Sequence, residues 1–187
     1  PLPPYGNNRT LCSSCRSNRR YFDRGYALLP YEEPVKKILH EIKFQKKPWL
    51  FRAFSQTVEN FLSTHELSHY EMIVPIPLDT RRERERSFNQ AFLIAKLIQE
   101  KNQKQHIRIR KVIRKKRHTA PQSQLRRRER LLNLDGAFVL KDSGRVRGKQ
   151  ILLVDDIVTT GSTINECAKV LKEAGAQRVD FFAVARS

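Results

Sequence analysis

The 187-residue sequence has no apolar run near the roughly 18 residues that a membrane span needs. No stretch combines a basic head, an apolar centre and a cleavage site, so we expect neither a membrane span nor an intact signal peptide. Only 3 cysteines are present, too few for a disulfide framework, which favours a reducing compartment and a cytoplasmic location. A Walker A lysine and a G-x-G-x-x-G loop are also missing, which disfavours nucleoside-triphosphate and dinucleotide folds of those types.

Acidic side chains are scarce, because 37 Lys and Arg stand against 19 Asp and Glu, a formal net charge of +18. Residues 81–130 alone hold 18 basic and 4 acidic side chains, whereas residues 151–187 have a net charge of −1. A block this basic is either a solvated face or a surface that meets a polyanion. Apolar residues still make up 39% of the chain, enough for the core of one domain.

Hydrophobic periodicity predicts strands and helices in alternation. Helical patterns begin at Pro34, Pro48, a capping box over Ser87–Gln90, and Ile164, the last of them ending at Gly175. The predicted strands cover residues 72–77, 107–113, 137–140, 150–154 and 179–185. Residues 1–20, 78–86 and 114–130 show no period and are predicted as loops. The alternation predicts an α/β fold with a parallel sheet.

The run from Ile151 to Thr163 is the most informative part of the sequence. An apolar strand carries Asp155 and Asp156 at its end, and a short loop of Thr, Gly and Ser then leads directly into a helix. Ligands of open α/β sheets bind at the carboxyl ends of strands. Backbone N–H groups over 160–163 can hold a phosphate there, with Gly161 allowing close approach, while the carboxylates suit sugar hydroxyls or a hydrated Mg²⁺. The predicted ligand is a ribose 5-phosphate with a metal-bound anionic group.

The same run resembles the motif of type I phosphoribosyltransferases, which bind phosphoribosyl pyrophosphate (PRPP). Beyond it, the chain from about Cys12 to Arg186 resembles the ComF family of competence-associated phosphoribosyltransferase-like proteins. The residues that carry this second resemblance are Val74-Pro75-Ile76-Pro77, Arg82 to Arg86, Ser87-Phe88-Asn89-Gln90, Gln124, Arg130, Asn133 and Gly175 to Val179. The resemblance implies a type I phosphoribosyltransferase-like parallel sheet flanked by helices, with a flexible hood loop.

The resemblance also implies a role for each polar segment. Asp155 and Asp156 would be catalytic, and the phosphate loop would comprise Thr159, Thr160, Gly161, Ser162 and Thr163. The pyrophosphate loop would supply Asp79, Arg81, Arg82, Arg86, Asn89 and Gln90, and the hood would supply Gln124 and Arg130. The implied chemistry is displacement at the anomeric carbon of ribose, with Mg²⁺ and arginines stabilising the departing pyrophosphate.

Cys12 and Cys15 form half of a four-ligand zinc pattern. They resemble the second of two C-x-x-C pairs in the ComF family, so residues 1–25 are expected to be an N-terminal loop region with a partial zinc-ribbon remnant. Residues 26–187 would then form the phosphoribosyltransferase-like domain. The alternative is a pair of unliganded thiols in a tail, with Zn²⁺ bound only if an upstream pair is present.

Three hypotheses about function are consistent with this predicted phosphate loop. The first is a ComF-type protein that binds PRPP with Mg²⁺ and serves DNA uptake with the uptake machinery, contacting single-stranded DNA. The second is an active phosphoribosyltransferase of nucleotide salvage or biosynthesis, although Thr159 stands where purine-using members carry an acidic base. The third is a PRPP-sensing regulator. Pyrophosphate needs only a handful of cations, so the excess charge favours DNA as well. The candidate contacts, which a solvated hood face would equally explain, are Lys115, Lys116, Arg117, Arg126, Arg127 and Arg128.

Overall fold

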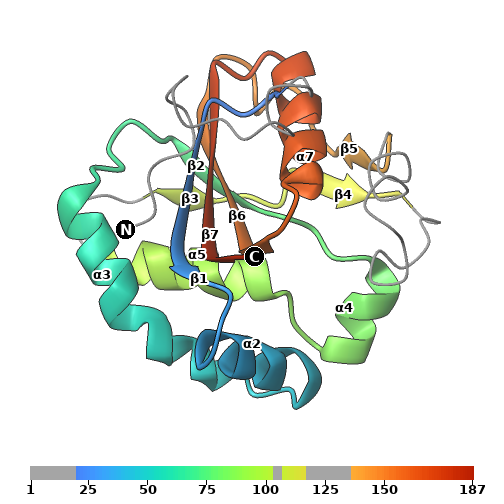
Figure 1. Ribbon diagram of the computed structural model, residues 1–187. Coiled ribbons are helices and arrows are strands. Elements are labelled where there is room, and N and C mark those ends of the chain that lie inside the picture. The colour runs from blue at the N-terminus through green and yellow to red at the C-terminus, as the bar shows by residue number, and fades with distance from the viewer. Residues whose placement is uncertain (1–19, 103–106, 117–135) are drawn as a thin grey trace.

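The computed structural model describes residues 20–102, 107–116 and 136–187. Its centre is a parallel sheet of five strands in the order β1-β7-β6-β2-β3 (Figure 1). The strands are β1 (Arg24–Pro30), β2 (Met72–Pro75), β3 (Arg108–Ile109), β6 (Gln150–Val158) and β7 (Arg178–Arg186). Since all five run in the same direction, their carboxyl ends lie at one edge of the sheet, which is where the predicted site residues fall.

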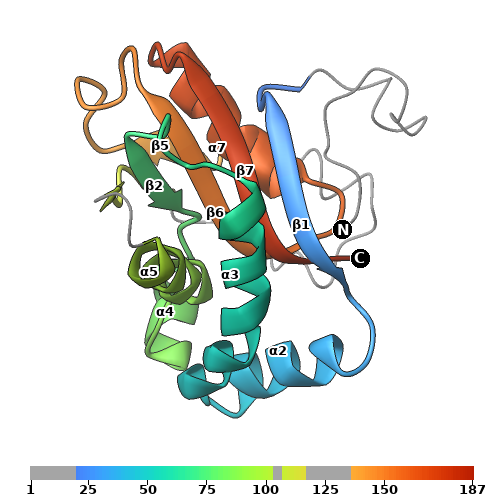
Figure 2. The same ribbon diagram turned by 90° about the vertical axis from the view of Figure 1, so that its left-hand side faces the viewer.

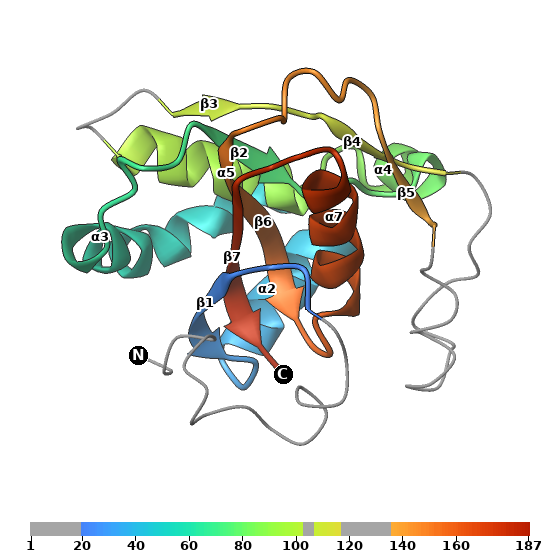
Figure 3. The same cartoon turned by 90° about the horizontal axis from the view of Figure 1, so that it is seen from above.

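Helices cover both faces of this sheet. One face packs against α2 (Val35–Phe44), the 3-10 helix η1 (Pro48–Phe54), α3 (Ser55–Thr64) and α5 (Gln90–Lys101). The other face packs against α7 (Ser162–Glu173) and a separate antiparallel pair, β4 (Ile113–Lys115) with β5 (Phe138–Leu140). Figure 2 shows α3 in front of the sheet and α7 behind it, and Figure 3 shows the same separation from above. The predicted sheet flanked by helices is therefore confirmed.

Alternation of side chains along the central strands explains the two cores. In β6, Ile151 and Leu153 are buried on the α7 side, while Leu152 and Val154 are buried on the α5 side. Strands that are buried on both faces read as continuous apolar runs, which is how β6 and β7 appear in the sequence. This pattern is the reason why both were predicted from the sequence.

Three predicted segments differ from the structure. The segment expected as a loop over 78–86 contains a helix, α4 (Thr80–Arg86), whose all-polar sequence gives no hydrophobic period. The single strand expected over 107–113 is two, because the chain leaves the sheet after β3 and pairs again only in β4. The loop expected from residue 114 therefore begins after Lys115. Strand β1 was not predicted and crosses residue 25, where the domain boundary was expected.

The start of α5 also differs from the prediction. Ser87 does not cap this helix, since it ends α4 in a left-handed conformation with φ 67°. The N-cap is Asn89, whose side chain accepts a hydrogen bond from the backbone N–H of Phe92 at 3.2 Å. The predicted capping box was therefore wrong by two residues. Strand β6 is also longer than expected, so Asp155 and Asp156 lie within it instead of after it.

Several predicted residues lie outside the described part of the chain. They are the zinc candidates Cys12 and Cys15, the hood residues Gln124 and Arg130, and the nucleic-acid candidates Arg117, Arg126, Arg127 and Arg128. Strands β4 and β5 flank the segment that holds the last six of these. Within the described residues, no helix has the length and apolar character needed to cross a membrane.

Candidate functional site

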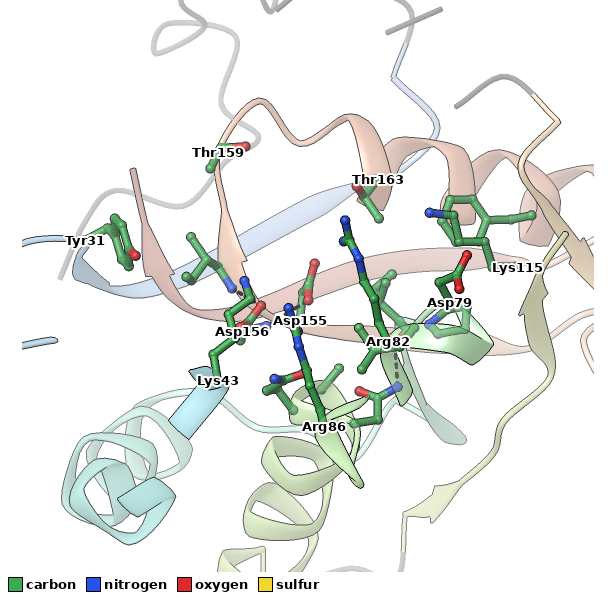
Figure 4. A pocket seen from close by; sticks show the side chains of 18 residues that line it. Tyr31, Lys43, Asp79, Arg82, Arg86, Lys115, Asp155, Asp156, Thr159 and Thr163 are labelled. Atoms are coloured by element: carbon green, nitrogen blue, oxygen red, sulfur yellow. Dashed lines mark hydrogen bonds between the residues drawn. The ribbon is translucent and has the colours of Figure 1, made fainter. Parts of the chain in front are cut away.

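A cavity of about 350 Å³ lies at the carboxyl end of the sheet. Nine of the residues predicted for the PRPP site line it: Asp79, Arg82, Arg86, Asn89, Gln90, Asp155, Asp156, Thr159 and Thr163; Lys115, predicted as a nucleic-acid contact, lines it as well. Figure 4 shows the charged members of this group converging from α4, β4 and β6. The structure thus gathers into one cavity segments that are more than 70 residues apart in the sequence.

Asp155 and Asp156 bring two adjacent carboxyl groups into the cavity from the carboxyl-terminal half of β6. The Asp155 carboxylate accepts the backbone N–H of Asp156, and the Asp156 carboxylate accepts that of Ile157, both at 2.9 Å. Burial raises the pKa of Asp155 well above its ordinary range, and the neighbouring charge of Asp156 raises it further. A cation bound beside the pair would favour its doubly ionised form.

The segment predicted as the phosphate loop, residues 159–163, follows directly and leads into α7. Gly161 is the N-cap of this helix, with a left-handed φ of 74°, and Ser162 is its first residue. The Thr160 hydroxyl lies 2.6 Å from the Ser162 hydroxyl and accepts the Ser162 N–H at 3.3 Å. Thr159 and Thr163 line the cavity, whereas Thr160, Gly161 and Ser162 do not. A helix amino end that faces a cavity with hydroxyl side chains is a favourable environment for an anion.

Two arginines reach the cavity from α4. Arg82 and Arg86 are one helical turn apart, so their side chains leave the same face of the helix and extend toward the two aspartates (Figure 4). Burial lowers the pKa of Arg86, and the charge of Asp156 acts in the opposite direction. Arg81 points elsewhere, since it pairs with Glu85 at 2.9 Å and its side chain is 87% exposed. The structure therefore places Arg82 and Arg86 in the site and Arg81 outside it.

Asn89 and Gln90 connect the arginines to the sheet. The Asn89 amide donates to the carbonyl of Ile76 at 3.0 Å, which ties the start of α5 to the residue after β2. Gln90 is only 3% exposed and accepts a hydrogen bond of 3.3 Å from Arg86. Both residues line the cavity, so in addition to capping and anchoring the helix they border the space available to a ligand.

Lys115 completes the cationic wall from β4. Burial lowers the pKa of its ammonium, and the nearby charge of Arg82 lowers it further. Its neighbour Lys116 is exposed and does not line the cavity; its backbone N–H donates to the Ala137 carbonyl at 2.8 Å. Of the two described nucleic-acid candidates, Lys115 therefore belongs to the cavity and Lys116 to the outer surface.

Tyr31 and Lys43 line the cavity but were not predicted. Tyr31 follows β1, the strand that the sequence analysis missed, and its N–H donates to the carbonyl of Arg186. Lys43 lies near the end of α2, and its charge lowers the pKa of Asp155. Neither residue belongs to a motif, so only the long-range packing of β1 and α2 could have identified them.

The donor set fits a magnesium ion that is shared with a ligand. In the described residues there is no group of three or more His, Cys, Asp and Glu side chains that could hold a metal on its own. Mg²⁺ is commonly held by one or two carboxylates together with substrate phosphates and water. Asp155 and Asp156 supply such a pair, while Arg82, Arg86 and Lys115 supply cations for the phosphates. The cavity is thus suited to a polyphosphorylated ligand that brings a divalent ion with it.

The comparison with protein families agrees with this class of site. The family described as "Phosphoribosyl transferase domain" matches residues 89–187, which contain β6, the aspartate pair and α7. The protein therefore has a type I phosphoribosyltransferase domain.

Relatives define the family more narrowly. The sequence is 30% identical to Competence protein F of Haemophilus influenzae, an alignment that covers 94% of this chain and 78% of the relative. It is 31% identical to DNA utilization protein YhgH of Escherichia coli, covering 98% of this chain and 81% of the relative. The chain belongs to the ComF family of competence proteins.

One solved structure has a distant similarity to this chain. It is a purine phosphoribosyltransferase from Pyrococcus horikoshii, with a TM-score of 0.42 and 13% sequence identity over 74% of this chain and 83% of that one. A similarity at this level says nothing about the acceptor substrate.

Proposed function

We propose that the cavity binds PRPP together with Mg²⁺, and that the protein serves DNA uptake through an additional contact with single-stranded DNA. The observation that carries the first part is the convergence of three different groups on one cavity: the aspartates of β6, Thr159 and Thr163 around the amino end of α7, and the arginines of α4. PRPP contains a ribose, a 5-phosphate and a pyrophosphate, and each group suits one of these parts.

The 5-phosphate would bind at the amino end of α7, where the helix dipole and Thr163 favour an anion. The ribose hydroxyls would donate hydrogen bonds to Asp155 and Asp156. The pyrophosphate would lie against Arg82 and Arg86, because guanidinium groups bind phosphate oxygens in pairs and stay charged when partly buried. When bound, Mg²⁺ would neutralise pyrophosphate charge beside the aspartates.

Calorimetry tests this proposal directly. PRPP is titrated into the wild type and into the double variant Asp155→Asn/Asp156→Asn, each with and without Mg²⁺. We expect Mg²⁺-dependent binding by the wild type and its loss in the double variant, because the amides cannot hold the metal. The matched control is Asp142→Asn, which changes an exposed carboxylate outside the cavity. Equal affinity in the wild type and the double variant would overturn the proposal.

The DNA part of the proposal rests on charge and on the relatives. Residues 81–130 carry a net charge of +14, more than a pyrophosphate requires. The names of the two relatives refer to competence and to DNA utilization. A basic surface that follows a nucleic-acid backbone explains the surplus charge, and its binding would weaken steeply with salt.

An active phosphoribosyltransferase is the second candidate, and the domain itself favours it. Thr159 lines the cavity at the position where an acidic base would serve a purine acceptor. A panel of nucleobases with labelled PRPP separates the candidates. Base-dependent release of pyrophosphate would establish an enzyme, whereas PRPP binding without turnover would favour a binding module or a PRPP-sensing regulator.

A further inference from the structure

The turn between α2 and η1 exposes two large aromatic side chains. Phe44, the last residue of α2, is 62% exposed, and Trp49, the second residue of η1, is 60% exposed. They are the only large hydrophobic side chains in the described part of the chain that are this exposed. We call Phe44, Trp49 and the turn 45–47 between them the aromatic corner.

The two helices that carry these rings are otherwise well packed, so the rings are not exposed because their surroundings lack a core. The same two elements bury Leu39, Ile42, Phe51 and Phe54 against α3 and α5. Phe44 instead lies beside the exposed ring of His40, one helical turn earlier, with centroids 4.5 Å apart. The chain then turns sharply through Lys46, in a left-handed conformation with φ 52°, and Pro48 begins η1. The fold therefore presents Phe44 and Trp49 on the outside of a defined turn.

The sequence around the aromatic corner is strongly basic. Residues 36–52 contain 6 Lys and Arg and a single acidic residue, Glu41, which is already paired with Lys47 at 3.0 Å. The exposed cations of this segment are Lys36, Lys37, Lys46 and Arg52. Cationic side chains around exposed rings disfavour a cationic partner and favour an anionic one that also has flat apolar surfaces.

The corner lies on the same side of the molecule as the candidate site. Figure 1 shows α2 beyond the carboxyl ends of β1, β6 and β7. Lys43, the residue before Phe44, lines the cavity. A polymer held at the aromatic corner would therefore lie on the same side of the molecule as the cavity.

We infer that the aromatic corner is a base-stacking site for single-stranded DNA. This inference rests on the proposed contact with single-stranded DNA and assigns it a place that the motifs did not indicate. Unpaired bases stack on exposed aromatic rings while lysines and arginines track the phosphates, and no particular base is required. A duplex hides the faces of its bases, so the site discriminates against double-stranded DNA.

Trp49 allows a direct test, because it is the single tryptophan of the sequence. An oligothymidylate is added to the full chain while Trp49 emission and the anisotropy of a labelled oligonucleotide are recorded. Stacking predicts that Trp49 emission is quenched in step with binding, and that a duplex of equal length produces much less quenching. Binding seen by anisotropy with unchanged Trp49 emission would overturn the inference.

Substitutions give a second, independent test. Because stacking of one base contributes about tenfold in affinity, Phe44→Ala and Trp49→Ala should each weaken binding about tenfold. Phe44→Tyr and Trp49→Phe keep a ring and should restore most of the affinity. These exposed positions can change without loss of the core, which thermal unfolding verifies.

The outcomes also separate this inference from the proposed function. If the wild type binds no single-stranded DNA, the DNA part of the proposed function fails and the stacking site fails with it. If the wild type binds and Phe44→Ala/Trp49→Ala binds equally well, only the stacking site is overturned. In that case the corner serves another occupant, and a change in sedimentation between the wild type and the double variant would identify it as a second copy of this chain.

Discussion

Gly161 combines a left-handed backbone conformation with a position in the segment predicted to bind the 5-phosphate. It caps α7 with φ 74°, a value that L side chains adopt only at a cost. A Cβ at this position would have ordinary contacts, with Val158 Cγ2 at 3.9 Å as its nearest neighbour. An added methyl group therefore brings backbone strain without a clash, and it lies in the loop that would hold the 5-phosphate.

The variant Gly161→Ala should lower the free energy of unfolding by about 1 kcal/mol, the cost of placing a side chain in the left-handed region. It should also weaken PRPP binding, because the strained loop relaxes away from its anion-binding shape. Gly148→Ala is the matched control, since Gly148 has φ 72° with similarly open surroundings and lies outside residues 159–163, the segment predicted to hold the 5-phosphate. Urea unfolding should show similar destabilisation in both variants. Calorimetry should show weaker PRPP binding only in Gly161→Ala. Equal PRPP affinity in the two variants would contradict this prediction.

Single residues also show where sequence reasoning stopped. Asp155 and Asp156 were predicted from a local motif, and the cavity contains both. Asp180 lies within an apolar run and was not singled out, yet it is fully buried and accepts hydrogen bonds from Tyr70, Arg178 and the backbone of Arg24. Burial and the hydrogen bond to Asp180 raise the pKa of Tyr70. The hydrogen-bond partners of Asp180 lie as many as 156 residues away in the sequence, so no local pattern could reveal this network.

Helix α4 explains how an element without a hydrophobic period still forms. Asp79 accepts the N–H of Arg81 at 2.9 Å and caps the helix, and the i,i+4 pair of Arg81 with Glu85 supports its exposed side. The sequence indicated charge but not helix, because such a polar segment lacks the apolar stripe that periodicity detects. The functional consequence is that Arg82 and Arg86 project from a helix, with the spacing of one turn, instead of from a loop.

Helix α5 depends on Asn89, which makes two hydrogen bonds at its start. The side chain accepts the N–H of Phe92 and donates to the carbonyl of Ile76. We expect Asn89→Ala to lower the free energy of unfolding by about 2 kcal/mol, since it loses a cap and leaves a carbonyl without its partner. Denaturant unfolding measures the change.

A second asparagine provides the control for this helix. Asn60 is exposed in α3 and accepts a side-chain hydrogen bond from Gln56 at 3.0 Å. Asn60→Ala should change the free energy of unfolding by less than about 0.5 kcal/mol, as exposed positions usually do. Because Asn89 also lines the cavity, Asn89→Ala should weaken PRPP binding whereas Asn60→Ala should not. If both variants were equally stable, the proposed anchoring of α5 to β2 would be wrong.

Over the whole molecule, the sequence predicted the sheet better than its edges. The buried strands β2, β6 and β7 were identified because their apolar runs are continuous. Edge strand β1 was missed because most of its side chains are only half-buried. The other edge strand, β3, was predicted within 107–113 but has only two residues, so its extent was overestimated. Tyr31 was missed because it follows the unpredicted strand β1, and Lys43 was missed because it belongs to no motif, although its helix α2 was predicted. The prediction of the cavity was therefore incomplete on that side.

The net charge of +18 also acts at the scale of the molecule. If single-stranded DNA is a partner, the logarithm of its binding constant should fall linearly with the logarithm of salt concentration, by about 0.7 for each phosphate contacted. Replacing Arg126, Arg127 and Arg128 by Ala should reduce the slope by about 2. Arg145→Ala/Lys149→Ala, which removes cations already paired with Asp142 and Glu71, should leave it nearly unchanged. A flat slope in the wild type would exclude this partner.

In the proposed function, one cavity recognises both ends of PRPP, with α7 on the 5-phosphate and α4 on the pyrophosphate. The most direct measurement compares PRPP with ribose 5-phosphate by calorimetry, in Mg²⁺, for the wild type and for Arg82→Ala/Arg86→Ala. We predict that the wild type binds PRPP far more tightly than ribose 5-phosphate, and that the double variant binds both with the same weak affinity. Equal affinities for the two ligands in the wild type, or an undiminished preference for PRPP in the variant, would contradict the claim.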